Sequence, residues 1–489
     1  MQSRTLKIYS YIYLILPVLI FFIGYLKPII SIPISIGICV MFFLLIKQAI
    51  EEKEKVISKI ILPILFIVIL IICIFAGQGG LFYQSADHHW RNAIFRDLVN
   101  FEWPVYYSDS NSALNYYIGH WMVPASIGKI FTPISQNIAW QVANISLLIW
   151  SAIGVTLAFL WLVKSIKIEK NKSIFLALFI FLFFSGLDII GTLFFNKSGL
   201  NELHLEWWAT NYQFSSMATQ LFWVFNQSIV AWLISLMFIN EKTVKNFFVL
   251  IILCLPYSPL PFAGLMILFA YRGFEYLIRS IKNKDLKNFF KDVFSIQNII
   301  SIICILPIYY FYYTTNSSTA NNGFRILSNL CTTEGIFKLL VFWFLEIGIY
   351  GIIIFSKYKK NGLFYASFLS LLFIPLFAIG GAYDFAMRAS IPSITICIYF
   401  VIKYLIDSIE SNRFKYKEII LISIIILGSI TSLFEYGRAI NTIRETKNIR
   451  AVADRIGTFS DKNPDEYTNF MTKEPQETIF FNYVVKPYK

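Results

Sequence analysis

Twelve long apolar runs dominate this sequence and limit what it can fold into. Most are eighteen residues or longer, enough for a helix to cross a hydrocarbon core of roughly 30 Å. Only 15% of the residues are charged, whereas a soluble domain averages about 25%. The sequence therefore predicts an all-α polytopic membrane protein. The runs lie near residues 8–26, 29–47, 58–76, 140–163, 174–195, 217–239, 247–271, 298–313, 336–356, 362–380, 389–406 and 418–436.

Positive charge gathers between the runs. A net charge of +13 in a membrane protein is expected to lie in cytoplasmic loops rather than to bind nucleic acid. With the N-terminus inside, the basic clusters after the second and fourth runs both fall in the cytoplasm. They are Lys47, Lys53, Lys55 and Lys59, and Lys164, Lys167, Lys170 and Lys172. The first run, which follows Arg4 and Lys7 and has no small-residue cleavage pattern, is expected to be a retained span.

The seventh run, 247–271, fits this topology only if the chain turns back within it. A single crossing would place the basic loop from Arg272 to Lys291, and later the one with Arg413, on the outside. Three prolines in Pro256-Tyr257-Ser258-Pro259-Leu260-Pro261 cannot continue a helix. We therefore expect a re-entrant hairpin that enters and leaves on the cytoplasmic side and walls a central cavity, beside about eleven transmembrane helices.

This topology divides the chain into a transmembrane domain, 1–436, and a small extracytoplasmic tail, 437–489. The tail is predicted to begin as a helix continuing from the membrane and to end in a strand-like stretch over Thr478–Val485. The other outer segments are 77–139, 196–216, 314–335 and 381–388. Five of the six cysteines lie in apolar runs and Cys331 lies in a loop, with no spacing that predicts a zinc site or a disulfide framework.

The outer segments hold all four histidines, and the richest cluster runs from Ser85 to Asp97. We expect a helix capped by Ser85, with Asp87 in its first turn, ending before Pro104. Its apolar face would lie on the membrane surface. The histidines are His88, His89, His120 and His204, the apolar face is Trp90, Ile94, Leu98 and Phe101, and a polar stripe is His89, Asn92 and Arg96.

Two interpretations of this cluster stay open. In one, the charges are simply solvated and Asp87 with Arg91 is an ordinary i,i+4 pair. In the other, Asp87 is a base beside the bilayer, and Arg91, His88 and His89 are cationic and imidazole donors to a phosphate. Metal binding is not indicated, because adjacent histidines on a helix point about 100° apart.

Further polar residues interrupt the apolar runs. Asp188 lies within Phe184–Gly191, and a carboxylate at membrane depth indicates either a functional site or a cap on a neighbouring helix. In Asn201–Trp208, the residues His204, Glu206 and Trp207 would suit a sugar, or the tryptophans would form an aromatic belt. Around Trp223 are amides that line a polar cavity or join helices, namely Gln213, Gln220, Asn226 and Gln227.

A last constellation spans Gly380–Pro392 and places Asp384 and Arg388 four residues apart at the start of a helix. They form either a structural ion pair or a site in which Arg388 faces a lipid-linked phosphate. The sequence contains no Walker loop, GxGxxG fingerprint or GxSxG elbow, so ATP-driven, dinucleotide and serine-hydrolase functions are unsupported.

These features resemble the C-type (GT-C) superfamily of integral-membrane glycosyltransferases. The shared pattern is many spans and a long first outer loop with an acidic residue soon after a transmembrane helix. Here the loop follows the segment from Cys73 to Gly77, carries Asp87, and continues as the expected interfacial helices 88–103 and 113–130. The stretches 185–191, 203–208 and 384–392 also resemble ones in uncharacterised bacterial members.

The resemblance implies a polyprenyl-phosphate sugar donor, chemistry at the outer face of a bacterial cytoplasmic membrane, and inversion at the anomeric carbon with Asp87 as base. Members often carry a second acidic residue next to the first, whereas His88 and His89 follow Asp87 here. The second carboxylate would then come from Asp188 or Glu206.

The leading hypothesis is therefore an inverting glycosyltransferase that modifies a cell-envelope glycan or glycolipid, without a cofactor. Asp87 would deprotonate the acceptor, and Arg91, Arg96 or Arg388 would stabilise the departing lipid phosphate. Glu206, Trp207 and Asp188 would orient the sugar. The alternatives are a transporter or flippase for a lipid-linked sugar, which the broken hairpin would serve, and a non-catalytic envelope-assembly protein.

Overall fold

The computed structural model describes residues 1–195, 204–318, 323–327, 330, 332–381, 383–411, 414–449 and 456–487. Several residues singled out above lie outside these ranges. They are Asn201, Glu202 and Leu203 of the tryptophan-containing stretch, Cys331 and Arg413.

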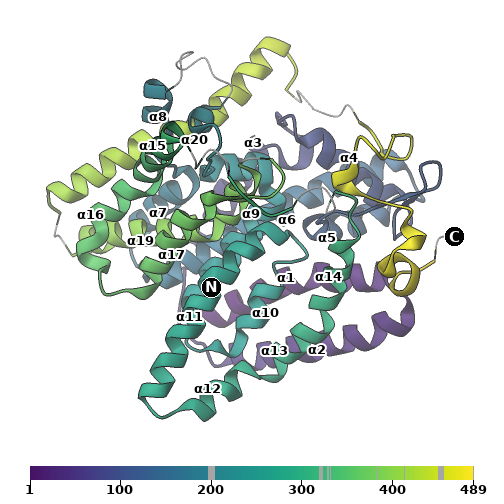
Figure 1. Cartoon of the computed structure of the whole chain (residues 1–489), viewed down its shortest axis with the longest axis horizontal. Helices are drawn as coiled ribbons and strands as arrows, with labels where there is room; N and C mark the ends of the chain where they lie inside the picture. Colours follow the sequence, from purple (N-terminus) through teal and green to yellow (C-terminus); the bar gives the residue numbers. More distant parts are fainter. Residues whose placement is uncertain are drawn as a thin grey trace.

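The described chain is mostly helical, and each apolar run forms one helix or an interrupted pair (Figure 1). Nine helical segments among these residues are long and apolar enough to cross a membrane. They are α1 (Ser3–Tyr25), α2 (Pro28–Ile50), α6 (Gln136–Ile166), α7 (Asn171–Phe183) with α8 (Asp188–Phe195), α9 (Met217–Asn240), α12 (Leu286–Val293) with α13 (Ile296–Cys304) and α14 (Leu306–Thr314), α15 (Thr333–Trp343) with η6 (Phe344–Gly348) and α16 (Ile349–Tyr358), α19 (Ile391–Glu410) and α20 (Tyr416–Thr446). The prediction of an all-α polytopic membrane protein is confirmed at this level.

Two further apolar helices are shorter, and small elements connect the long ones. The shorter helices are α3 (Ile61–Phe75) and α17 (Gly362–Phe373), which continues as η7 (Ile374–Leu376). The connecting elements are η1 (Gln78–Gly80), η3 (Leu205–Ala209), η4 (Val244–Asn246), α18 (Asp384–Ala389) and the two-stranded pair β3 (Arg325–Ile326) and β4 (Phe377–Ala378).

The proline-broken run forms the predicted hairpin. α10 (Phe247–Ile252) ends before the prolines and α11 (Pro259–Lys282) begins at them. The Tyr276 hydroxyl donates to the carbonyl of Glu241 at 3.0 Å, so the chain returns to the level at which it entered. The predicted bounds of the second arm are wrong: α11 continues eleven residues past 271, because Arg272 and Arg279 pair with Glu275 between them and so extend the helix.

The tip of the hairpin is held by three hydrogen bonds to distant elements. The carbonyl of Pro256 accepts from the backbone N–H of Gly119 at 2.9 Å. The Tyr257 hydroxyl donates to the Tyr13 carbonyl at 3.1 Å, and the Ser258 hydroxyl to Gln227 Oε1 at 2.9 Å. The non-helical backbone is thus surrounded by protein, as broken backbone in a membrane protein requires.

The segment 77–139 differs from the prediction in its packing. Its helices are α4 (His88–Asn100) and α5 (Gly119–Lys129), and between them lie β1 (Tyr106–Tyr107) and β2 (Ser112–Leu114). The expected surface helix over 88–103 is instead enclosed by protein, with Ile94, Leu98 and even Asp97 fully buried. The second expected helix, 113–130, begins only at Gly119. An apolar stripe looks the same whether lipid or protein covers it.

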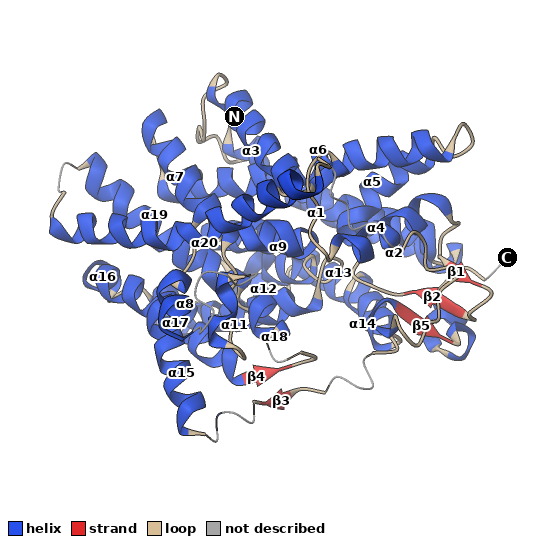
Figure 2. Cartoon of the chain, turned by 90° about the horizontal axis from the view of Figure 1, so that it is seen from above, coloured by secondary structure: helices blue, strands red, loops and turns tan. Residues whose placement is uncertain are grey.

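The tail folds back onto this segment (Figure 2). α20 continues to Thr446, as predicted, but the expected strand over Thr478–Val485 is the helical turn η10 (Phe480–Val484), because Thr478 and Pro475 close a turn there. The strand of the tail is β5 (Met471–Lys473), which follows η8 (Thr468–Phe470) and precedes η9 (Pro475–Glu477). It pairs antiparallel with β2 in the order β1-β2-β5, with Ala113 opposite Thr472.

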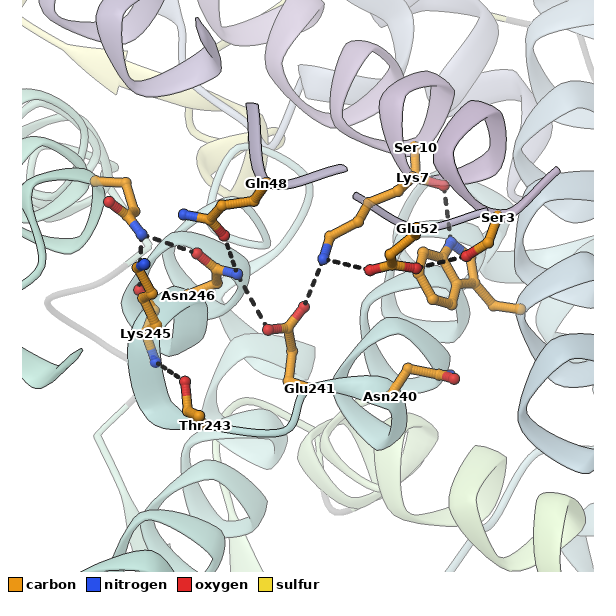
Figure 3. A network of polar contacts seen from close by, with 12 residues as sticks. Ser3, Lys7, Ser10, Gln48, Glu52, Asn240, Glu241, Thr243, Lys245 and Asn246 are labelled. Carbon is orange, nitrogen blue, oxygen red and sulfur yellow. Dashed lines mark hydrogen bonds and ion pairs between the residues drawn. The ribbon is translucent and has the colours of Figure 1, made fainter. Parts of the chain in front are cut away.

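Near the N-terminal end of α1 lies a network of charged side chains that are wholly or partly buried (Figure 3). Glu52 accepts from Lys7 at 2.9 Å and from Lys164 at 2.5 Å, and Lys7 also lies 3.8 Å from Glu241. These residues come from α1, the loop after α2, α6 and the loop after α9. The network therefore joins the ends of three helices to one carboxylate.

Candidate functional site

A cavity of about 500 Å³ lies between α4, the tip of the hairpin, α18 and the tail. It is assembled from segments far apart in the chain. Its walls are Asp87, Trp90, Arg91, Tyr116, Tyr117, Pro259, Leu260, Tyr313, Asn316, Ser318, Ile379, Gly380, Gly381, Asp384, Arg388, Asn469 and Phe470. The sequence-predicted pairs Asp87–Arg91 and Asp384–Arg388 thus meet in one cavity.

The first pair is formed within α4. Arg91 Nη2 donates to Asp87 Oδ2 at 3.1 Å, as the i,i+4 spacing predicts. Asp87 is the N-cap residue of the helix, whereas the expected cap Ser85 instead bonds to His88 Nδ1 at 2.9 Å. The Asp87 side chain is 42% exposed and that of Arg91 only 6%. The carboxylate is therefore the accessible group, and the guanidinium supports it from within the protein.

The second pair repeats this arrangement on α18. Arg388 Nη1 donates to Asp384 Oδ1 at 2.7 Å, and the side chains are 15% and 43% exposed, respectively. The Arg388 charge lowers the pKa of Asp384, against the opposing effect of burial. Burial would lower the pKa of Arg388, but the Asp384 carboxylate and the nearby phenols of Tyr117 and Tyr116 raise it. Both groups are therefore charged across the physiological pH range.

Aromatic rings form much of the remaining wall. The ring of Trp90 stacks on Phe470 of the tail at 5.4 Å, and Phe470 also lies 5.0 Å from the ring of Tyr116. Tyr116 and Tyr117 have ring centroids 3.7 Å apart. Trp90 is thus a cavity residue rather than part of a lipid-facing surface. Flat rings next to carboxylates and guanidinium groups suit a ligand that has both apolar ring faces and hydroxyl or phosphate groups.

Arg96, a predicted phosphate ligand, does not line the cavity and instead holds the tail. Its Nη1 donates to the carbonyl of Gly457 at 2.9 Å, and its guanidinium lies over the Trp140 ring at 4.5 Å. Beside it, Asp97 accepts from the Tyr107 hydroxyl at 2.7 Å and from the backbone N–H of Phe459 at 3.0 Å. Burial raises the pKa of Asp97 to about 6, although these hydrogen bonds oppose the rise.

The histidines of this region do not line the cavity either. His88 is buried against Phe225, and burial holds its pKa well below the usual value. His89 contacts the Trp90 ring at 4.6 Å. His120 is bonded to Ser151 at 3.0 Å, and burial lowers its pKa to about 3. Because His88 is buried and does not line the cavity, it is not placed to be the imidazole donor to a phosphate that the sequence suggested.

Asp188, His204, Glu206 and Trp207 form a second cluster, and none of them lines the cavity that holds Asp87. The Trp208 Nε1–H donates to Asp188 at 3.2 Å. His204 Nδ1 lies 3.0 Å from Glu435, and the 40%-exposed Trp207 packs on the His204 ring at 4.4 Å. The second carboxylate in the cavity that holds Asp87 is therefore Asp384, not Asp188 or Glu206. Contacts between segments far apart in the chain decide which residues line the same cavity.

The amide side chains around Trp223 form hydrogen bonds to other side chains of the protein. Gln220 accepts from the Trp232 Nε1–H at 2.7 Å, and Gln213 donates to Glu206 at 2.7 Å. The first bond lies within α9 and the second joins the loop before α9 to η3, so neither of them joins two membrane-spanning helices. Among the residues that the structure describes, no group of three or more His, Cys, Asp or Glu side chains is arranged to hold a metal ion.

Sequence reasoning missed about half of the cavity. Tyr116, Tyr117, Asn316, Asn469 and Phe470 were not singled out. The adjacent tyrosines in the loop 77–139 were a usable signal, because tyrosine rings with a polar hydroxyl are enriched at binding interfaces. The tail residues Asn469 and Phe470 carried no such signal in the sequence. No family model, curated protein or solved structure matches this chain.

Proposed function

We propose that this protein is an inverting glycosyltransferase that uses a polyprenyl-phosphate sugar at the outer face of a bacterial cytoplasmic membrane. The acceptor would be a cell-envelope glycan or glycolipid. The observation that carries this proposal is the convergence of Asp87–Arg91 and Asp384–Arg388 on one aromatic-walled cavity of about 500 Å³. A volume of this size suits one sugar and a phosphate, since ligand sites commonly measure about 300–1,000 Å³.

The proposed reaction is a single displacement. Asp87 removes the proton of the acceptor hydroxyl, the hydroxyl oxygen attacks the anomeric carbon from one face, and the bond to the phosphate oxygen breaks on the other. Asp87 suits this role because its carboxylate is exposed to the cavity while Arg91 holds it in place. The product would carry the inverted configuration.

The arginines would stabilise the departing phosphate. Arg91 Nη1 and Arg388 Nε have no hydrogen-bond partner within the described chain, so each guanidinium retains a donor after pairing with its aspartate. Donors held in place before reaction are usually the largest contribution to such catalysis. Asp384 would position Arg388 and bind sugar hydroxyls, the role first considered for Asp188, Glu206 and Trp207.

The test is sugar transfer by purified protein in nanodiscs, with a panel of polyprenyl-phosphate sugars and envelope acceptors. Asp87→Asn should abolish transfer while the protein remains folded. Asp109→Asn is the matched control, because Asp109 lies exposed in the turn between β1 and β2. Transfer that survives Asp87→Asn would remove Asp87 as the base, and no transfer from any donor would reject the enzyme.

A transporter or flippase for a lipid-linked sugar is the second candidate. Interrupted helices favour it, since transporters often bind substrates at such breaks, and α7–α8 and the hairpin tip are both interrupted. Translocation of a labelled lipid-linked sugar across liposomes, without transfer to any acceptor, would select this alternative.

A further inference from the structure

Three carboxylic acids lie together in the interior, away from the cavity with Asp87. Asp188, Glu206 and Glu346 are each at most 3% exposed. They come from three separate elements: Asp188 begins α8 after the interruption at 184–187, Glu206 lies in η3, and Glu346 lies in the wider helical turn η6. Two helix interruptions and the turn η3 therefore each bring one carboxyl group into the same region.

The contacts of these groups tie the elements together. Asp188 accepts from the Ser185 hydroxyl at 2.8 Å and from Trp208, and it lies close to Glu346. Glu206 accepts from Gln213 at 2.7 Å and from the backbone N–H of Ser216 at 2.8 Å. A hydrogen bond between two carboxyl groups requires a proton on one of them, because carboxylates are acceptors only.

None of the three carboxyl groups has a cationic partner within the described chain. The cation Arg438 of α20 is paired with Glu435. Glu346 Oε1 is buried without a hydrogen-bond partner, and Glu346 borders a hole of about 20 Å³, enough for one water molecule. Burying three carboxylates without a counter-charge would cost several kcal/mol each. The protonated, neutral form of these groups therefore has the lower free energy.

We propose that Asp188, Glu206 and Glu346 form a proton-binding site that is loaded at neutral pH and releases a proton to water in mildly alkaline solution. The proposal does not depend on the glycosyltransferase assignment. Burial, and then the charge of Asp188, raises the pKa of Glu206 to about 8. The other titratable or charged groups facing the site are Tyr350 from α16, Cys397 from α19, His204 next to η3, and Glu435 and Arg438 from α20.

Proton release would act on the contact between two interrupted segments, α7–α8 and α15–η6–α16. The backbone N–H of Leu187 donates to the carbonyl of Leu345 at 3.1 Å, and the Glu346 side chain lies directly against Gly186. Ionised Glu206 would add a second negative charge close to Asp188 and would repel Asp188, which begins the segment on one side of this contact. The stabilisation is therefore expected to be complete below about pH 4.5, the ordinary pKa of a glutamate, and to be lost as the pH rises from there through about 8.

The direct measurement is the infrared C=O stretching band of protonated carboxylic acids, recorded on the whole protein in nanodiscs between about pH 6 and pH 10. The wild type should show this band at pH 7 and lose part of it with a midpoint near pH 8. Glu206→Gln should remove the titrating part, and Glu346→Gln should remove the non-titrating part. Glu435→Gln is the matched control, a glutamate equally buried but paired with Arg438.

Two results would overturn the proposal. One is a wild-type spectrum without a protonated-carboxyl band at pH 7, which needs no variant and so does not depend on variants folding. The other is a rise in the unfolding temperature with added Na⁺ that Glu346→Gln abolishes, because the site would then hold a metal cation instead of protons. Loss of the band in Glu435→Gln alone would likewise contradict it.

Discussion

The carboxylate of Asp97 accepts a hydrogen bond from the backbone N–H of Phe459, 362 positions later in the chain, at 3.0 Å. The same oxygen accepts from the Tyr107 hydroxyl, and the side chain is fully buried. Asp97 thus fixes the tail to α4, and the tail in turn brings Asn469 and Phe470 to the cavity. One buried carboxylate outside the cavity therefore helps to hold that wall in place.

We predict that Asp97→Ala releases the tail, whereas Asp97→Asn keeps it in place. Alanine leaves the Phe459 N–H without an acceptor, at a cost of about 1–3 kcal/mol, while the asparagine carbonyl can still accept. Hydrogen exchange of the amides in 456–473 measures the difference and should be faster only in Asp97→Ala. Equal protection in both variants would contradict the role of Asp97.

The attachment of the tail should also depend on pH. The pKa of Asp97 is raised to about 6, so the folded state binds this proton more tightly than the unfolded chain does. The stabilisation is complete below about pH 4 and is lost as the pH rises through 6. Exchange of the same amides, corrected for intrinsic rates, should therefore be slower at pH 5 than at pH 8, and Asp97→Asn should abolish this dependence.

Gly264 tests how closely α11 must approach α18. A Cβ atom there would overlap the carbonyl oxygen of Ala389, next to Arg388. Gly264→Ala should push the helices apart, cost on the order of 1–3 kcal/mol and reduce any activity of the cavity. Gly273→Ala on the same helix is the control, because nothing lies within 4 Å and alanine favours helix by up to about 1 kcal/mol. A normal unfolding temperature and activity for Gly264→Ala would show that the helices need not be so close.

The Asp384–Arg388 pair should behave as a coupled unit. Asp384→Asn leaves the mostly buried Arg388 charge without its partner and should cost about 1–3 kcal/mol. The double variant Asp384→Asn, Arg388→Gln should recover part of this stability but not the transfer activity, which we expect to fall about 10²–10³-fold. Thermal unfolding and transfer assays on both single variants and the double variant complete the cycle. Additive losses of stability would mean that the pair is not coupled.

The charge network at Glu52 gives a prediction for acid stability. Lys7, Lys164 and hydrogen bonds outweigh the effect of burial and lower the pKa of Glu52 to about 2. The stabilisation is therefore present above about pH 4.5 and is lost as the pH falls toward 2. Glu52→Gln should lower the unfolding temperature at pH 7 and reduce its dependence on pH in this acidic range. An unchanged unfolding temperature at pH 7 would show that the network adds no stability.

Local rules predicted the features that depend on neighbouring residues. The positions of the apolar helices, the break at Pro256–Pro261 and the two i,i+4 aspartate–arginine pairs all follow from spacing. Contacts between distant segments could not be predicted from the spacing of residues. Nothing near Asp87 indicates that Asp384 lies across the same cavity. Glu346 is a single acid in an apolar run, as Asp188 is, but it was not singled out.

Because β5 pairs with β2, the cavity can be completed only late in protein synthesis. Phe459 is made 362 residues after Asp97, which at about 5–20 residues per second is a delay of roughly 20–70 s. During that time α4 and α18 can already be inserted and packed, but the wall formed by Asn469 and Phe470 is absent. The rate of translation therefore sets the delay before the cavity is complete. A nascent chain stalled before β5 holds both aspartate–arginine pairs in a cavity that is still open.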